Sequence, residues 1–364
     1  MAATVALAHD YLTQRGGAER VVLSMLAAFP AAPVHTSMFD PDRTFPAFAT
    51  QDVRTLAMNR MPLLRRDHRL ALPLLAPSFA RLRVDADVVL CSSSGWSHGL
   101  QTNGVKIVYC HTPARWLYQS DQYLRTSSRL RRVTLAALTP WLQDWDRRSA
   151  HSAQRYLANS TVVRDRIAEI YDVEATIVPP PQTIDIQGGQ DAIDGIEEDF
   201  FLCVSRLLPY KYVDVVMAAV NASRGERLVV VGTGPERSRL NALGSSATRL
   251  LGSVSEAQLR WLYANCRGLV TAAYEDYGLT PLEAAAFGKP TAALRWGGFL
   301  DTVVEGHTGV FFDQPEPSEV AEALAELVRC QWDQDALRAH AEHFAEHNFI
   351  ERLRSIIAEE LAPG

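Results

Sequence analysis

The chain has 364 residues, of which 47% are hydrophobic and 21% are charged. This length suits two domains better than one, and the composition excludes a disordered chain. The net charge is −6, but residues 1–180 carry 21 Lys and Arg against 15 Asp and Glu, whereas residues 181–364 carry 15 against 27. A basic half followed by an acidic half indicates two domains with different partners.

The ends and the cysteines bear on the compartment. The first residues, MAATVALAHDYL, lack a basic stretch and predict a first strand rather than a signal peptide. No apolar run reaches the length of a membrane span. The 5 Cys lie mostly in apolar runs without metal-ligand spacing, which predicts buried thiols in a reducing compartment. We therefore expect a cytoplasmic protein.

Short β-branched runs alternate with helical patterns along the chain. Most of these runs are continuously apolar, as is typical of strands buried on both faces of a parallel sheet. Strands are expected at 4–10, 87–93, 106–112, 155–160, 175–180, 200–205, 227–234, 249–254, 268–274, 290–294 and 308–312, and helices at 17–29, 212–223, 255–266, 318–328 and 349–361. The alternation predicts an α/β fold with two doubly wound, Rossmann-like domains.

One segment interrupts the alternation. Residues 179–199 are rich in Pro, Gly and acids and show no periodicity, so they are predicted to link the domains. We expect a first domain at 1–182 and a second at 183–344. The final helix has no strand after it and fits either domain.

Two features of the first half suggest ligand contacts. Gly16 and Gly17 stand between the first strand and the first helix, where a backbone can approach a ligand closely and helix N–H groups can meet phosphate. A turn needed only for packing is an equally good interpretation, and the absence of a GxGxxG pattern argues against a dinucleotide dehydrogenase. His111 ends a buried strand at the edge where open α/β sheets bind ligands, although a structural role is the simpler explanation.

The second half begins with two cations that suit a diphosphate. Arg206 follows the strand 200–205, and Lys211 comes soon after it. Arg binds phosphate oxygens through a fork of N–H groups and Lys binds them as a point charge, whereas two solvated surface charges are the simpler alternative. Gly232 and Gly234 lie in a turn that either admits a nucleotide or is merely tight.

The segment EDYGLTPLEAAAFGKP, which begins at Glu275, carries further polar groups. Its TPLE sequence predicts a helix with Thr280 as N-cap and Glu283 as the reciprocal partner in a capping box. Gly278 and Leu279 would then precede the helix with N–H groups free for an anion. Glu283 thus has a structural explanation, and Glu275 is the stronger candidate for a sugar contact.

Together these segments resemble family 4 glycosyltransferases, which have the GT-B fold of two Rossmann-like domains facing across a cleft. The order and spacing match along nearly the whole chain. The matching residues are Gly16 and Gly17 after HDYL, His111 in YCHTPARW, Arg206 and Lys211 in VSRLLPYK, GTGP at 232–235, and Glu275 and Glu283 in EDYGLTPLE.

The resemblance implies a retaining enzyme that moves a hexose from a nucleotide-diphosphate donor to a hydroxyl of a glycan or lipid-linked acceptor. The first domain would lie on the acceptor side, the second would bind the nucleotide sugar, and the last helix, at about 345–364, would return to the first domain. Arg206 and Lys211 would bind the diphosphate and stabilise the leaving nucleotide. Glu283 would bind the ribose hydroxyls, and Glu275 the transferred sugar.

Further contacts are implied in the same way. His111 would contact the 6-hydroxyl of the sugar, and Gly16 and Gly17 would approach the diphosphate from the first domain. Backbone groups would complete the donor site, namely those of Gly278, Leu279 and Thr280 toward sugar or phosphate and those around Val254 toward the base. The resemblance implies no metal and no cofactor besides the co-substrate, because the cations already supply the charge that a departing diphosphate needs.

A departure from the usual family pattern bears on the donor. Asp276 and Tyr277 replace a Gly-Phe pair, and with KPTAALRWGGFLDTV this variant looks closest to bacterial mannosyltransferases of lipopolysaccharide or polysaccharide synthesis. We therefore expect GDP-mannose as donor.

Basic segments in the first half suggest a further partner. Residues 60–83 mix bulky apolar residues with Arg, and residues 125–132 add more Arg. They predict either peripheral attachment to the anionic inner face of the cell membrane, beside a lipid-linked acceptor, or a packed helix pair with a solvated basic face. Nucleic acid is not expected, because the whole chain is acidic.

Two other functions compete with sugar transfer. A nucleotide-sugar epimerase of the same fold would need additional acid and base residues, and none stands out. A non-catalytic subunit that only binds sugar nucleotides predicts damaged donor residues, but Arg206, Lys211, Glu275 and Glu283 are all present.

Overall fold

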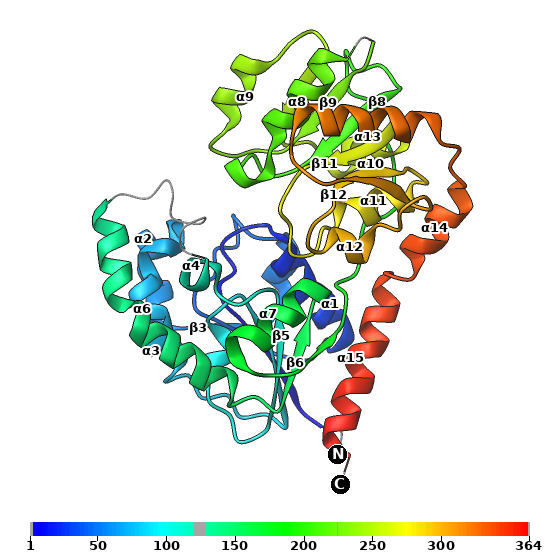
Figure 1. Cartoon of the computed structure of the whole chain (residues 1–364). Helices are drawn as coiled ribbons and strands as arrows, with labels where there is room; N and C mark the ends of the chain where they lie inside the picture. Colours follow the sequence, from blue (N-terminus) through cyan, green and yellow to red (C-terminus); the bar gives the residue numbers. More distant parts are fainter. Residues whose placement is uncertain (1–2, 120–128, 224, 363–364) are drawn as a thin grey trace. The chain divides into compact units, whose positions relative to one another are not determined.

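The structure is a computed structural model that describes residues 3–119, 129–223 and 225–362 (Figure 1). The chain forms two compact units, one of Met1–Pro180 with His347–Gly364 and the other of Pro181–Glu346. Among the described residues, no helix combines the length and the apolarity that a membrane crossing requires.

The first unit is built on a parallel sheet of seven described strands in the order β3-β2-β1-β4-β5-β6-β7. Its strands are β1 (Val5–His9), β2 (Val34–Thr36), β3 (Val53–Thr55), β4 (Val88–Ser93), β5 (Val105–Cys110), β6 (Arg155–Ala158) and β7 (Ala175–Ile177). Its helices include α1 (Gly17–Ala28), α2 (Pro62–Arg66), α3 (Leu72–Phe79), α4 (Arg115–Tyr118), α6 (Arg129–Ala150) and α7 (Thr161–Tyr171).

Sequence patterns located the central strands of this sheet but not two at its edge. Every residue of β4 is buried, which explains its continuous apolar run. β2 and β3 were not predicted, because their three-residue sequences, VHT and VRT, each contain a single apolar residue. Such short strands leave no periodicity in the sequence.

The last helix, α15 (Glu346–Leu361), packs on the first unit. Its buried residues Phe349, Leu353 and Ile356 recur at helical spacing and join the core around Leu7 and Tyr109. Arg155 on β6 pairs with Glu359 and Glu360 near the end of the helix. An apolar stripe therefore fixes α15 to this unit, and exposed ion pairs add little to the attachment.

The second unit contains a parallel sheet of six described strands in the order β10-β9-β8-β11-β12-β13. The strands are β8 (Phe200–Val204), β9 (Leu228–Val231), β10 (Thr248–Gly252), β11 (Cys266–Thr271), β12 (Thr291–Leu294) and β13 (Gly309–Phe312). The helices include α8 (Val213–Ala222), α9 (Arg237–Leu243), α10 (Glu256–Asn265), α11 (Thr280–Ala286), α12 (Phe299–Thr302), α13 (Pro317–Arg329) and α14 (Gln334–Glu342). The two parallel sheets establish the predicted α/β fold class.

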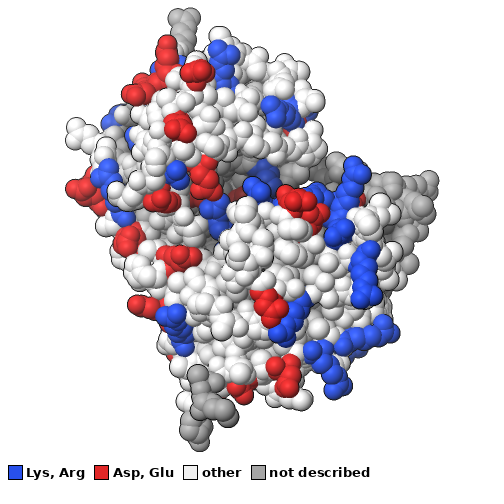
Figure 2. Space-filling model, turned by 180° about the vertical axis from the view of Figure 1, so that it is seen from behind, with Lys and Arg blue, Asp and Glu red and all other residues white. Residues whose placement is uncertain are grey.

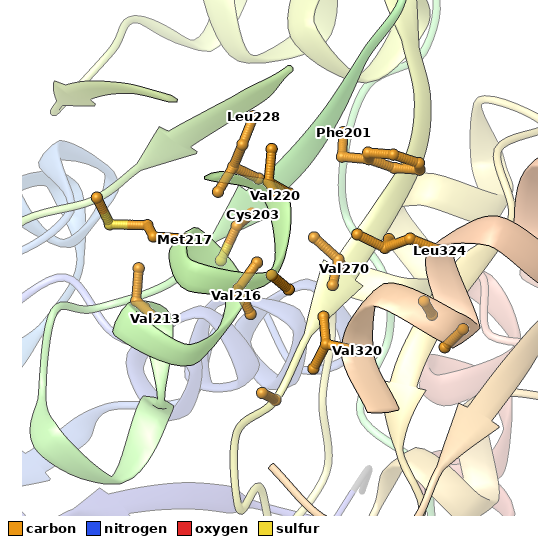
Figure 3. Close-up of a cluster of buried hydrophobic side chains, with 14 of the residues drawn as sticks. Phe201, Cys203, Val213, Val216, Met217, Val220, Leu228, Val270, Val320 and Leu324 are labelled. Atoms are coloured by element: carbon orange, nitrogen blue, oxygen red, sulfur yellow. The ribbon is translucent and has the colours of Figure 1, made fainter. Parts of the chain in front are cut away.

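A buried apolar cluster holds helices against one face of this second sheet (Figure 3). Val216 and Val220 of α8 and Leu324 of α13 meet Phe201 of β8 and Val270 of β11. Burying a side chain of this size contributes about 1.5–3 kcal/mol, so the helices are firmly held.

Most of the segment predicted as a linker packs on the second unit. The division between the units falls after Pro180, and Ile184, Ile193 and Ile196 then join the apolar cluster around Phe200. The segment lacks periodicity because isolated side chains anchor it, rather than a regular helix or strand.

Candidate functional site

The donor-site residues predicted for the second unit follow four neighbouring strands. Arg206 comes after β8, Gly232 after β9, Val254 after β10 and Glu275 after β11, and the order β10-β9-β8-β11 places these strand ends side by side. The carboxyl edge of an open parallel sheet is where such folds bind ligands. The sheet thus gathers these residues at one edge, although they span 70 positions of the chain.

Lys211 and Glu275 form an ion pair at this edge. The side chain of Lys211 is only 4% exposed and that of Glu275 is 30% exposed. Lys211 lies in a single 3-10 turn (Pro209–Lys211) after β8, and Glu275 lies in the loop after β11. A nearly buried ammonium group has lost most of its hydration, so its interaction with a carboxylate or a phosphate is stronger than at the surface.

Arg206 stands beside this pair at the end of β8. Its Nη2 donates to the hydroxyl of Tyr210 at 3.4 Å, and the ring of Tyr210 also lies 5.0 Å from Nζ of Lys211. Arg206 is exposed, whereas Lys211 is buried. Two cations of different depth therefore flank one aromatic ring, an arrangement that can bind an extended anion such as a diphosphate.

The glycine turn after β9 lies directly against the Arg206 segment. The amide of Leu207 donates to the carbonyl of Thr233 at 2.9 Å. A Cβ atom at Gly232, whose φ is +140°, would lie 1.8 Å from the carbonyl oxygen of Ser205, and one at Gly234 would lie 2.3 Å from that of Leu207. Only glycine permits this approach, so the turn is required for packing whether or not a nucleotide also uses it.

Helix α11 departs from the predicted capping box. The helix begins at Thr280, its N-cap is Leu279 in helical conformation, and no side chain of the described residues caps it. The prediction of Thr280 as N-cap with Glu283 as its partner is therefore wrong, because Thr280 already belongs to the helix. Glu283 instead accepts a 2.6 Å hydrogen bond from the hydroxyl of Tyr263 on α10.

The loop before α11 is held in place by backbone contacts. Gly278 has a φ of +89°, a conformation that other residues rarely adopt, and a Cβ there would lie 2.5 Å from the ring of Phe299. The amide of Gly298 donates to the carbonyl of Glu275 at 3.0 Å. The position of Glu275 is thus set by backbone, which leaves its carboxylate to Lys211.

In the first unit, Gly16 is the N-cap of α1 and Gly17 begins that helix. The first turn of the helix places Glu19 fully inside the protein, where Nε2 of Gln14 donates to its Oε1 at 3.0 Å. Glu19 Oε1 also lies 3.8 Å from Nε2 of His9. A Cβ atom at Gly16 would lie 2.5 Å from Oε2 of Glu19. A buried carboxylate packed against Gly16 is a feature that the sequence patterns did not indicate.

His111 belongs to a chain of polar groups at the carboxyl ends of β1, β4 and β5. Nδ1 of His9 lies 3.1 Å from the carbonyl oxygen of Ser92 and 3.0 Å from its hydroxyl, and that hydroxyl lies 2.8 Å from Nε2 of His111. A carbonyl can only accept, so Nδ1 of His9 carries a proton. The Ser92 hydroxyl is thus a hydrogen-bond partner of both rings, with Nδ1 of His9 on one side and Nε2 of His111 on the other.

The charge states agree with this assignment. Burial lowers the pKa of His9, but its contacts with Glu19 outweigh burial and the pKa is raised overall. Burial and the neighbouring charge of His9 lower the pKa of His111 to about 3. His111 is therefore neutral near pH 7.

Asp10, beside His9, is also buried and accepts hydrogen bonds from the amides of Ser94 at 2.8 Å and Ser97 at 2.7 Å. Burial raises its pKa. Among the described residues, no group of three or more His, Cys, Asp or Glu is placed to hold a metal ion.

The sequence patterns did not identify four polar residues of this first-unit network as candidate site residues, namely His9, Asp10, Glu19 and Ser92. The available signal was the placement of His9, Asp10 and Ser92 at strand ends, in the runs HDYL and CSSS.

Comparison with known families agrees with the division into two units. A model described as Glycosyltransferase Family 4 matches residues 15–185, and one described as Glycosyl transferases group 1 matches residues 192–345. The chain belongs to the glycosyltransferases of the GT-B fold that join a family 4 domain to a group 1 domain.

Two curated relatives match parts of the chain. A D-inositol 3-phosphate glycosyltransferase of Nocardioides sp. is 28% identical over 225 residues, which cover 52% of this chain and 49% of that protein. An alpha-1,3/1,6-mannosyltransferase ALG2 of Dictyostelium discoideum is 39% identical over 77 residues, which cover 21% of this chain and 18% of that protein. The chain thus spans about half or less of these relatives.

Two solved structures share the fold over their whole length. Anabaena HepE in complex with UDP and glucose has a TM-score of 0.69 and 14% identity, covering 98% of this chain and 100% of that one. The lipopolysaccharide outer core galactosyltransferase WaaB in its apo form has a TM-score of 0.64 and 15% identity, covering 98% and 99%. At these identities the likeness concerns the fold alone.

Proposed function

We propose that this protein is a retaining glycosyltransferase that moves a hexose from a nucleotide-diphosphate donor to a hydroxyl of a glycan or lipid-linked acceptor. The observation that carries the proposal is the placement of Arg206, Lys211 and Glu275 at the ends of the neighbouring strands β8 and β11. Two cations and a carboxylate at this edge suit a diphosphate and the sugar attached to it.

In this proposal the cations act on the leaving group. As the bond between the sugar and the diphosphate breaks, negative charge grows on the diphosphate oxygens. Arg206 and Lys211 stabilise that charge, and because both are already fixed by Tyr210 and Glu275, little reorganisation is needed. With these cations, no metal is needed to stabilise the leaving diphosphate. That the enzyme works without a metal remains a prediction from the sequence.

Glu275 and Glu283 bind different parts of the donor. Glu275 accepts hydrogen bonds from hydroxyls of the transferred sugar through lone pairs that its ion pair with Lys211 leaves available. Glu283, oriented by Tyr263, accepts from the ribose hydroxyls. Backbone groups at Gly278, Leu279, Thr280 and Val254 complete the donor contacts.

His111 and the glycine pair serve the reaction from the first unit's sheet edge. Neutral His111 forms a hydrogen bond with a sugar hydroxyl, for which its hydrogen bond with Ser92 orients the ring. Gly16 and Gly17 offer backbone amides at the start of α1 to the diphosphate. The acceptor hydroxyl attacks on the face that the diphosphate leaves, which retains the anomeric configuration.

For the donor we propose GDP-mannose, on the strength of the Asp276-Tyr277 variant and the sequence that follows it. Anabaena HepE is in complex with UDP and glucose, so uridine donors are the direct competitor. A thermal-shift panel of GDP, UDP and ADP, each with its hexose derivatives, decides between them. A rise in Tm selective for GDP-mannose supports the proposal, and a rise only with a uridine donor overturns the choice of base.

Turnover distinguishes the remaining alternatives. Release of nucleoside diphosphate with transfer of the hexose to a mixture of glycan acceptors supports a transferase. An epimerase would convert the nucleotide sugar into its isomer without an acceptor, and a non-catalytic subunit would bind the donor without consuming it. Either result, obtained with a donor that raises Tm, contradicts the proposal.

A further inference from the structure

A pocket of about 480 Å³ on the first unit has no part in the donor chemistry described above. It is lined by Asp40, Arg43, Pro62, Arg65 and Arg66, and we call it the arginine pocket. Three guanidinium groups and one carboxylate give it a net positive charge.

The cations of the arginine pocket are not neutralised by the described part of the chain. No described carboxylate forms an ion pair with Arg43, Arg65 or Arg66, and Nε of Arg65 is buried without a hydrogen-bond partner. Arg54 of the same unit, in contrast, pairs with Asp52 at 2.7 Å. Clustered cations repel one another unless an anion joins them, and forked guanidinium groups match phosphate oxygens.

The pocket also lies near the predicted site of the first unit. Its Asp40 follows β2, and the amide of Asp40 donates to the carbonyl of Leu12, just after β1, at 2.9 Å. Nε of Arg15 donates to the carbonyl of Thr44 at 3.0 Å. The loop that carries Asp40 and Arg43 is therefore hydrogen-bonded to the loop that leads into Gly16.

Two exposed apolar residues are the sequence neighbours of a residue that lines the pocket. Met61 is 51% exposed and Leu63 is 65% exposed, on either side of the pocket residue Pro62. Leu63 and Arg66 stand three positions apart on α2, so they share one face of that helix. Leu64 of the same helix is buried, so the segment both packs inward and presents apolar groups outward.

Basic and apolar groups therefore occur together on this part of the first unit. Figure 2 shows several Lys and Arg side chains at the right of the lower part of the view, with others scattered over the rest of that face. Of the other predicted basic segment, 125–132, residues 125–128 lie outside the described residues, and the inference below does not use the segment.

We infer that the arginine pocket binds the phosphoryl or diphosphoryl group of a lipid, with the lipid chain on Met61 and Leu63. The guanidinium groups bind the phosphoryl oxygens, and the apolar side chains shield the first carbons of the chain from water. The lipid is either the acceptor or a bilayer headgroup beside it. The acceptor role rests on the proposed glycosyltransferase function, whereas the binding chemistry does not.

The test measures binding to the full chain without any turnover. Inorganic phosphate, geranyl phosphate and uncharged geraniol are titrated by calorimetry against the wild type, the double variant Arg43→Gln/Arg65→Gln, and the control Arg81→Gln/Arg83→Gln. The control arginines belong to the same basic segment but do not line the pocket. The donor-binding cations of the second unit are unchanged throughout, so differences between the proteins isolate the first unit.

We expect the wild type to bind geranyl phosphate better than phosphate and not to bind geraniol. The pocket variant should bind geranyl phosphate at least about tenfold more weakly, because it lacks two of the three guanidinium groups, and the control should match the wild type. Leu63→Ser should remove the preference for the geranyl chain, whereas Leu243→Ser, which is 46% exposed on the second unit, should not. Equal weakening in the pocket and control variants, or none in either, would overturn the inference.

Co-sedimentation with phosphatidylglycerol and phosphatidylcholine vesicles identifies the source of the phosphoryl group. Loss of phosphatidylglycerol binding in the pocket variant alone supports a bilayer headgroup. Unchanged vesicle binding, together with weaker geranyl phosphate binding, supports a lipid-linked acceptor. The Tm rise with the nucleotide sugar should persist in the pocket variant, so a failed lipid titration with an intact donor shift refutes this inference without touching the donor proposal.

Discussion

The hydroxyl of Ser92 lies 2.8 Å from Nε2 of His111 and connects that ring to the buried His9. The connection holds the His111 ring in one orientation. A residue that lies behind His111 in this way affects catalysis through orientation rather than by contact with substrate.

Replacing Ser92 with Ala should therefore reduce kcat about three- to tenfold while leaving KM for the donor nearly unchanged, because a positioning hydrogen bond of about 1 kcal/mol is lost. Steady-state kinetics measure the two constants. Ser97→Ala is the matched control, since its hydroxyl donates to the carbonyl of Ser92 instead of to a ring. An equal loss in both variants would show that the effect is merely structural.

The low pKa of His111 predicts the direction of acid sensitivity. In the unfolded chain His111 binds a proton below about pH 6.5, whereas in the folded chain it stays neutral until about pH 3. Between these two values, His111 therefore lowers the free energy of unfolding as the pH falls. His111→Gln should reduce this loss by up to about 1.4 kcal/mol per pH unit. Urea unfolding between pH 7 and pH 4 measures the change.

His9 should behave in the opposite way. Its raised pKa gives stability that is present below 6.5 and lost as pH rises through the folded value. His9→Gln should therefore be most harmful under mildly acidic conditions. If the gap between each variant and the wild type were constant with pH, neither ring would titrate as assigned.

Because the nearly buried Lys211 pairs with the half-buried Glu275, changing either residue should reduce both turnover and stability. Lys211→Ala and Glu275→Ala should each abolish measurable turnover. Each should also lower the free energy of unfolding, by about 1–3 kcal/mol, because the remaining charge, which is partly or nearly buried, loses its ion-pair partner. From the sequence alone an intact fold was expected in both variants, since no pattern pairs the two residues.

Calorimetry and nucleotide-release assays test both parts of this prediction. Arg338→Ala is the control, because it removes an exposed ion pair with Asp335, and such pairs contribute at most about 1 kcal/mol. Wild-type turnover in either Lys211→Ala or Glu275→Ala would remove that residue from its proposed role.

Tyr263 should govern donor affinity through Glu283. Tyr263→Phe deletes the 2.6 Å hydrogen bond to the carboxylate, so KM for the nucleotide sugar should rise several-fold, with a loss of about 1–2 kcal/mol in stability. Tyr156→Phe is the control, since its buried hydroxyl has no hydrogen-bond partner among the described residues. An unchanged KM in Tyr263→Phe would separate Glu283 from the ribose.

Sequence patterns predicted the strands that are buried on both faces and most of the charged residues that follow them. They failed where the signal was short or ambiguous. The three-residue strands β2 and β3 have no periodicity, and the TPLE sequence matches a capping box although Glu283 bonds to Tyr263 instead. A pattern of neighbouring residues cannot reveal a hydrogen-bond partner that lies twenty residues away on another helix.

The sequence by itself determined two α/β domains and the order of their ligand-binding segments, because buried parallel strands and the turns after them depend on residues that are neighbours in the chain. The tertiary structure alone decided which side chains meet. The strand order β10-β9-β8-β11 gathers Arg206, Gly232 and Glu275, and burial then pairs Lys211 with Glu275 and connects His9 to His111 through Ser92. Those contacts join residues that are distant in the chain, and the physical cause is that a buried polar group must find a partner wherever the fold supplies one.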